Sequence, residues 1–79
     1  MGEPVNFDVD CDTRGLKCPL PVMKARKRMK PLPPGTILRL VADDPLAAID
    51  VPNFCREDGH GLISSDDKGG VLTFYIAKG

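Results

Sequence analysis

Prolines divide this chain into stretches that can be helical and stretches that cannot. Pro19 and Pro21 stand at the head of a stretch that is closed by Pro31-Leu32-Pro33-Pro34-Gly35. A proline suits the first turn of a helix, where its missing N–H would have no intrahelical partner, but it cannot continue a helix. The spacing therefore predicts a helix from Pro19 to about Lys30, with Pro19 at its first position and Cys18 as its N-cap.

The predicted helix has one apolar side. Val22, Ala25 and Met29 recur at steps of three and four residues, which predicts a single stripe packed on a sheet. Leu20 and Met23 fall off this stripe, close to the cysteine in sequence. We predict that both lie at the surface as candidate contacts for a partner.

Two segments on either side of this helix have the pattern of strands. Val5, Phe7, Val9 and Cys11 alternate with polar residues, which is typical of a strand with one buried face and places Cys11 in the core. The stretch from Thr36 to Ala42 is mostly apolar and predicts a largely buried strand. A strand, a helix and a strand in succession favour a right-handed parallel crossover.

A second helix is expected after Asp43-Asp44-Pro45, which has an acidic cap residue followed by proline. Pro52 is expected to interrupt this helix, because a proline inside a helix removes a backbone donor. The prediction is a short piece to about Asp50 and a continuation from Pro52 to about Asp58. Its expected core residues are Ile49, Phe54 and Cys55.

The last part of the chain predicts a β-hairpin. Residues 62–66 and 71–77 flank the turn-forming stretch Asp67-Lys68-Gly69-Gly70, and Leu72, Phe74 and Ile76 are predicted to face inward. The element order is then β-α-β-α-β-β. We predict an α+β fold, a two-layer α/β sandwich with two helices on one face of a four-stranded sheet.

Composition indicates one ordinary globular domain, residues 1–79, with 42% hydrophobic and 28% charged residues. No apolar run is long enough to span a bilayer and no secretory leader is evident, so we expect a cytoplasmic protein without a membrane partner. The three cysteines are an odd number, which argues against a closed disulfide framework.

Cys18 is the candidate reactive residue. Helix N-termini favour negative charge, and Arg14 and Lys17 are close in sequence, so we predict a thiolate whose pKa lies below the ordinary value of about 8.5. With Pro21 in the first turn, the N–H of Leu20 is expected to be the main backbone donor facing the cap position. That arrangement suits one sulfur better than a phosphate, which needs several free N–H groups. The alternative is inert packing, the usual role of a free cysteine.

Seven of the eleven basic residues lie near this cysteine with no acidic residue between them. Such a run is either a solvated face or a docking surface for acidic partner proteins. RNA is a weaker candidate, because the run holds no aromatic residues that would stack on bases. The seven residues are Arg14, Lys17, Lys24, Arg26, Lys27, Arg28 and Lys30.

Three further roles for the cysteines and the single histidine stay open. A Cys₃His zinc site from Cys11, Cys18, Cys55 and His60 is disfavoured, because no Cys-x-x-Cys pair anchors it. A redox protein or peroxide sensor with Cys55 as the resolving thiol requires Cα atoms within about 7 Å. His60 is expected at a helix end, where the dipole favours a cationic imidazole, and a Cys-His pair with Cys18 is a third alternative.

The segment around Cys18 also carries a resemblance. Asp12-x-Arg14-Gly15-x-x-Cys18-Pro19-x-Pro21 resembles the CPxP signature of the TusA/SirA-like family, small bacterial sulfur carriers whose motif cysteine holds a persulfide sulfur. The basic helix after Val22-Met23, the stretch Ala42-Asp43-Asp44-Pro45 and the segment from Asp50 to Cys55 are similar to the family at matching spacing. The resemblance runs from about Phe7 to the C-terminus.

The resemblance implies a mixed sheet, like that of the C-terminal domain of bacterial translation initiation factor three. It implies a carrier without a classical active-site pocket, metal or cofactor, so that its standing as an enzyme is open. The implied donor is a cysteine desulfurase, and the implied acceptor is a downstream sulfur-relay protein leading to 2-thiouridine at the tRNA wobble position, with tRNA involved only indirectly. Molybdenum cofactor synthesis, sulfur oxidation and selenium metabolism are alternative destinations.

Each implied role falls on residues already noted. Cys18 carries the sulfur, Arg14 and Gly15 complete the motif, and Pro19 and Pro21 fix the geometry of the sulfur. Arg14 and Lys17 favour the anionic persulfide. Partner docking falls to the exposed residues of the first helix and its approach, namely Lys17, Leu20, Met23, Lys24, Arg26, Lys27 and Arg28.

Overall fold

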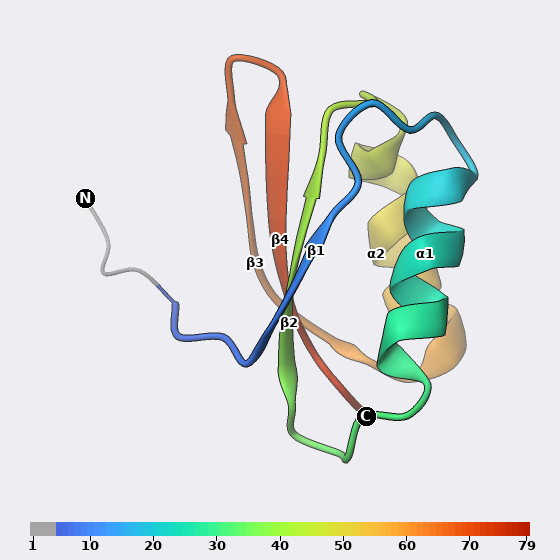
Figure 1. Cartoon of the computed structure of the whole chain (residues 1–79), viewed down its shortest axis with the longest axis vertical. Helices are drawn as coiled ribbons and strands as arrows, with labels where there is room; N and C mark the ends of the chain where they lie inside the picture. The colour runs from blue at the N-terminus through green and yellow to red at the C-terminus, as the bar shows by residue number, and fades with distance from the viewer. Residues whose placement is uncertain (1–4) are drawn as a thin grey trace.

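A computed structural model describes residues 5–79 and shows two layers, with both helices on one face of a four-stranded sheet (Figure 1). The predicted fold class and the element order β-α-β-α-β-β are confirmed. The elements are β1 (Val9–Asp12), α1 (Leu20–Met29), β2 (Ile37–Ala42), α2 (Ala47–Asp58), β3 (Gly61–Lys68) and β4 (Val71–Ala77). Within the described residues, no helix is both long and apolar enough to cross a membrane.

The sheet is mixed, with strand order β1-β2-β4-β3. The strands β1 and β2 are parallel, as the strand-helix-strand succession predicts, while β4 is antiparallel to both β2 and β3. The register places Cys11 beside Leu40 and Leu40 beside Phe74, and all three side chains are buried. This row of side chains forms the floor on which the helices pack.

The core lies between the sheet and the two helices. Every second residue of β2 and β4 is buried, and the predicted inward residues Leu72, Phe74 and Ile76 are among them. Ala25 and Met29 of the predicted stripe are buried, Val22 is half-buried, and Pro21 takes the remaining buried place on α1. Fully burying one large apolar side chain contributes about 1.5–3 kcal/mol, so these faces hold the helices in place.

The start of α1 differs from the prediction by one residue. The helix begins at Leu20, so Pro19 is the N-cap and Cys18 precedes it, joined to Pro19 by a cis peptide bond. The N–H of Leu20 donates to the carbonyl of Lys17 at 2.8 Å, and the prediction that it is a free donor at the cap position is wrong. The reason is a hydrogen-bonded turn over residues 17–20, which uses this donor before the helix starts.

The first strand is shorter than its alternating pattern predicts. It begins at Val9, and Phe7 is 39% exposed instead of facing the core. The guanidinium of Arg39 lies 4.5 Å from the centre of the Phe7 ring, and the ring of Tyr75 lies 6.1 Å from it. Phe7 therefore packs on the sheet face opposite to the helices, because these side chains offer it contacts there.

The second helix corrects two predictions. Pro52 lies inside a continuous α2, so the predicted break at this proline is wrong. Burial of Val51, Phe54 and Cys55 on both sides of Pro52 offsets the missing backbone donor. Phe54 and Cys55 are core residues as predicted, but Ile49 is 62% exposed, because an unbroken helix turns it away from the sheet.

The hairpin turn is tighter than predicted. Asp67 and Lys68 belong to β3, and the turn consists of Gly69 and Gly70, with φ values of +60° and +89°. Two-residue hairpin turns favour positive φ at both positions, which glycine adopts without strain. The first strand of the hairpin therefore ends two residues later than predicted, while the second strand begins at Val71 as predicted.

Candidate functional site

The loop that carries Cys18 is fastened to the β2–α2 loop. The Thr13 N–H and hydroxyl both donate to the carbonyl of Val41, at 2.7 and 2.6 Å. The N–H of Gly15, at a φ of +87°, donates to the Asp43 carboxylate at 2.9 Å, and the N–H of Cys18 donates to Asp44 at 2.6 Å. The two consecutive aspartates therefore hold the loop by its backbone and fix where the cysteine stands.

Cys18 is exposed and its sulfur lies against α2. Its Sγ–H donates to Oδ2 of Asp50 at 2.7 Å. The side chain borders an open depression of about 280 Å³ between α1 and α2. The other residues that line this depression are Pro19, Val22, Arg26, Asp50, Asn53, Phe54 and Glu57.

Negatively charged carboxylates surround the sulfur of Cys18. The hydrogen bond to Asp50 raises the pKa of Cys18, and partial desolvation together with the charges of Asp50 and Asp44 raises it further. The prediction of a lowered pKa is therefore wrong. That prediction rests on the basic residues that are close to Cys18 in sequence. The fold instead brings carboxylates from the β2–α2 loop and from α2 to the thiol, and these raise its pKa.

Arg14 bonds to Asp12 and not to Cys18. Its guanidinium forms two bonds to the Asp12 carboxylate, at 3.0 and 2.9 Å, and these bonds lower the pKa of Asp12 to about 2. Lys24 donates to the backbone carbonyl of Asp12 at 3.2 Å. Arg14 therefore stabilises the loop at the end of β1, two residues after the strand.

The basic residues of α1 and of the loop before it include two groups with different surroundings. Arg26 bonds to Asp58 at 2.8 Å, lies 3.9 Å from Glu57 and stacks 5.1 Å from the Phe54 ring, so it ties α1 to α2. A second group is exposed, with no ion pair recorded within residues 5–79. This second group, called here the basic face, consists of Lys17, Lys24, Lys27 and Arg28.

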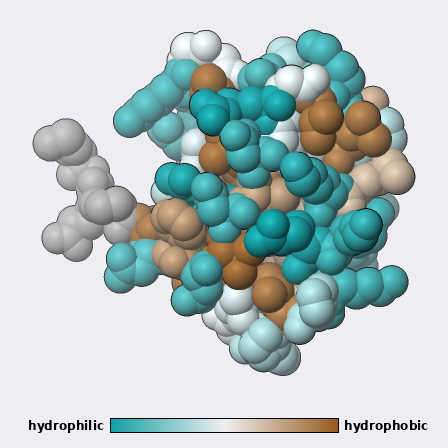
Figure 2. Space-filling view, viewed as in Figure 1, coloured by the Kyte–Doolittle hydropathy of each residue, from teal (hydrophilic) through white to brown (hydrophobic). Residues whose placement is uncertain are grey.

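Exposed apolar side chains flank the cysteine. On α1, Leu20 is 46% and Met23 is 54% exposed, as predicted. Two more are not indicated by the sequence pattern, namely Leu46 at 52% and Ile49 at 62% exposure, which lie within two residues of Asp44 and Asp50, the carboxylates that bond to Cys18. Figure 2 shows hydrophobic atoms gathered over the N-terminal end of α1 among hydrophilic surroundings. We call these four residues the apolar rim.

The other two cysteines belong to the core. Cys11 and Cys55 are 1% and 3% exposed, and burial raises the pKa of both thiols. Neither residue lines the depression at Cys18. The resolving role for Cys55 stays an untested alternative. Among residues 5–79, no group of three or more His, Cys, Asp or Glu side chains is placed to hold a metal ion.

His60 lies apart from the thiol. Its Nδ1 accepts a hydrogen bond from the N–H of Gly79 at 3.0 Å, and its ring meets the Phe54 ring edge-on at 5.4 Å. Burial lowers the pKa of His60, with a further contribution from Lys78, so the neutral imidazole is favoured and the prediction of a cationic one is wrong. His60 does not line the depression at Cys18.

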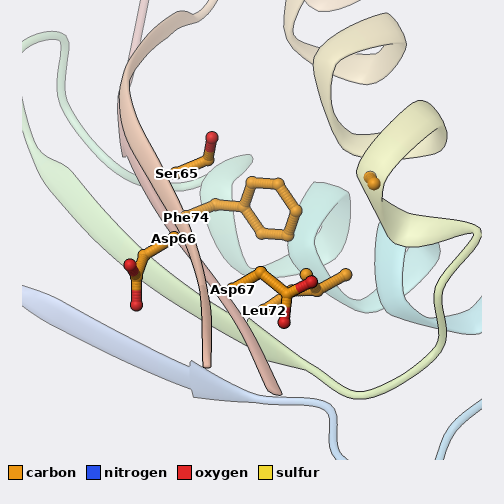
Figure 3. A pocket seen from close by; sticks show the side chains of 6 residues that line it. Ser65, Asp66, Asp67, Leu72 and Phe74 are labelled. Carbon is orange, nitrogen blue, oxygen red and sulfur yellow. The ribbon is translucent and has the colours of Figure 1, made fainter. Parts of the chain in front are cut away.

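A second open depression, of about 320 Å³, lies between α2 and the β3–β4 hairpin (Figure 3). The ring of Phe74 points from β4 towards the helices, and the Asp67 carboxylate lies beside Leu72. Cys18 does not line this depression. The thiol instead lies exposed at the depression between α1 and α2.

Known proteins are similar to this chain in sequence and in fold. The family model described as "Sulfurtransferase TusA" matches residues 10–78. A "Sulfur carrier protein TusA" from Pseudomonas fluorescens is 36% identical over 80 residues, covering 99% of this chain and 96% of that protein. A protein of the same name from Allochromatium vinosum is 36% identical over 73 residues, covering 92% and 96%. The solved structure of a SirA-like protein from Desulfitobacterium hafniense has the same fold, with a TM-score of 0.81, 23% identity and coverage of 91% and 99%.

Proposed function

This chain belongs to the TusA family, and on that premise we propose that it is a sulfur carrier whose Cys18 holds one sulfane sulfur as a persulfide. The observation that carries the proposal is the division of the three cysteines: Cys18 is exposed in a CPxP segment, while Cys11 and Cys55 are buried. Relatives that match nearly the whole chain bear the name of sulfur carrier proteins.

The chemistry needs one thiol and a docked partner. The Cys18 sulfur attacks the outer sulfur of a donor persulfide, the donor's S–S bond breaks, and a new S–S bond forms on Cys18. The same exchange in the opposite sense passes the sulfur to an acceptor thiol. A shallow, open setting suits this reaction, because both partners bring their own sulfur to the surface.

We propose a cysteine desulfurase as the donor and a sulfur-relay protein as the acceptor, in a path to 2-thiolation of the tRNA wobble uridine. The basic face and the apolar rim support protein docking, because exposed apolar side chains beside unpaired charges are typical of transient interfaces.

Pro19, Pro21 and Gly15 set the geometry of the loop, and Arg14 acts through Asp12. The molybdenum, sulfur-oxidation and selenium destinations stay alternatives, as does a thiol redox or regulatory role for Cys18, and the cytoplasmic location stays a prediction.

Intact mass tests the carrier role. The chain is incubated with a cysteine desulfurase, its pyridoxal phosphate and free cysteine under nonreducing conditions. We expect a gain of one sulfur atom that reductant reverses, lost in Cys18→Ser and kept in Cys55→Ser. Unchanged loading of Cys18→Ser, or no loading with several donors, would overturn the proposal.

A further inference from the structure

The carboxylate of Asp50 is the group in direct contact with the sulfur of Cys18. Oδ2 accepts the Sγ–H hydrogen bond at 2.7 Å, across 32 residues of sequence. Asp50 lies in the first turn of α2, so a packed helix fixes its position. Within residues 5–79 no ion pair is recorded for Asp50, which leaves its charge directed at the thiol.

The other charged groups around the sulfur leave this effect of Asp50 in place. Asp44, from the β2–α2 loop, bonds to the Cys18 N–H and adds negative charge on the same side. Across the depression, the Arg26 guanidinium is already bonded to Asp58 and near Glu57. The exposed Lys17 precedes Cys18 in the chain, and its charge acts on Asp44. A thiolate at Cys18 would still face the carboxylates of Asp50 and Asp44, whereas a protonated thiol donates a hydrogen bond to Asp50.

We propose that Asp50 controls the reactivity of Cys18, holding the unloaded sulfur against α2 as a protonated thiol and repelling the sulfur once it carries a persulfide charge. This inference rests on the proposed carrier function and adds to it a way for the empty and loaded states to differ. The raised pKa of Cys18 agrees with the geometry.

Sulfur loading then follows a balanced course. The Sγ–H proton passes to a solvent base, and the thiolate attacks the outer sulfur of the donor persulfide. The donor's cysteine leaves as a thiolate and takes up one proton, so one S–S bond replaces another without net oxidation. The anionic persulfide on Cys18 cannot donate to Asp50, and the repulsion by Asp50 and Asp44 favours its turning out of the depression towards an acceptor.

Alkylation by iodoacetamide tests Asp50 without any sulfur chemistry. The rate at Cys18 is followed by intact mass as a function of pH in the wild type, Asp50→Asn and Glu57→Gln, a control that lines the same depression without bonding to the sulfur. In Asp50→Asn we expect the pKa of Cys18 to fall, so that more thiolate is present near neutral pH and the rate there rises about threefold. The high-pH plateau should fall, because a thiolate of lower pKa is intrinsically less nucleophilic.

Opposite changes at the two ends of the pH profile are a signature that a merely structural role would not produce. Asp50→Ala, which removes the hydrogen bond as well as the charge, is expected to shift the profile in the same direction. Profiles of both variants that coincide with the wild type, or an equal shift in Glu57→Gln, would overturn the inference.

Glutathione persulfide as sulfur donor separates the two proposals. If wild-type Cys18 takes up no sulfur from it or from a desulfurase, the carrier function fails, while the alkylation profiles still decide the role of Asp50. If the wild type takes up sulfur but Asp50→Asn alkylates as the wild type does, the control by Asp50 fails alone.

Discussion

Asp44 accepts two backbone hydrogen bonds where the β2–α2 loop meets the start of α1. The N–H groups of Cys18 and Leu46 donate to it at 2.6 and 3.1 Å, and the bond from Cys18 is the larger cause of its lowered pKa. A carboxyl with a lower pKa in the folded than in the unfolded state stabilises the fold above its unfolded pKa, about 3.9 for Asp. That contribution is lost as the pH falls through the folded pKa.

Asp44→Asn is therefore expected to lower the urea midpoint at neutral pH and to flatten the loss of stability below about pH 4. Urea unfolding at a series of pH values measures both effects. The control is Asp66→Asn, an exposed carboxyl on β3, which should leave the midpoint and the slope unchanged. An acid-side slope as steep in Asp44→Asn as in the wild type would contradict this assignment.

The cysteines are expected to respond differently to serine. Cys18 is exposed, so Cys18→Ser should change the free energy of unfolding by no more than about 0.5 kcal/mol. Cys55 is 3% exposed, and Cys55→Ser places a hydroxyl in the core at a cost of about 1–3 kcal/mol. Urea unfolding of the two variants at neutral pH measures the difference. A loss of stability in Cys18→Ser as large as the one expected for Cys55→Ser would show that Cys18 is part of the packed core.

At the scale of elements, α2 decides what surrounds the thiol. Its buried side holds Val51, Phe54 and Cys55, so the opposite side turns Ile49 to solvent. The flank of α2 that borders the depression towards α1 carries Asp50 to Cys18. The helix keeps this orientation through Pro52, whose missing N–H removes one backbone hydrogen bond. The helix continues because the free energy gained by burying side chains on either side of the proline exceeds the cost of this missing hydrogen bond.

Pro52→Ala should therefore stabilise the protein. A proline inside a helix destabilises the folded state by about 3 kcal/mol relative to alanine. Replacing it also frees the unfolded chain, which lowers the free energy of unfolding by about 1 kcal/mol. Allowing for lost side-chain contacts of this half-buried residue, we expect a net gain of about 1–2 kcal/mol in urea unfolding. A lower urea midpoint would show that the proline is needed where it stands.

Periodicity predicted the parts of the fold that depend on neighbouring residues. The inward side of β4, Ala25 and Met29 on α1, and the burial of Cys11 all follow from spacing along one element. The strand order and the contact between Cys18 and Asp50 depend on how separate elements pack, which spacing does not encode. For the same reason sequence proximity predicts the wrong sign for the shift of the Cys18 pKa, because the groups that act on the thiol are Asp50 and Asp44, which are distant in sequence.

At the scale of the whole molecule, a net charge of zero conceals an uneven surface. The basic face lies on α1 and its approach, whereas carboxylates stand at the thiol and on the β3–β4 hairpin, where Asp66 and Asp67 line the second depression. A partner that approaches Cys18 along α1 meets positive charge first and the acidic surroundings of the sulfur afterwards. On the proposed function, long-range attraction of an acidic partner and local control of the thiol would therefore depend on different residues.

Reversing one charge on the basic face tests the attraction. Lys27→Glu on α1 should weaken binding of a cysteine desulfurase about threefold at low salt. This loss should shrink as the salt concentration rises, and it should be small at about 1 M, where the screening length is about 3 Å. Lys68→Glu, an identical change at the end of β3, is the matched control and should bind as the wild type does. Titration calorimetry at several salt concentrations measures both variants. Equal losses in the two would mean that net charge alone attracts the partner, and a loss that salt does not reduce would mean that Lys27 contributes packing instead of charge.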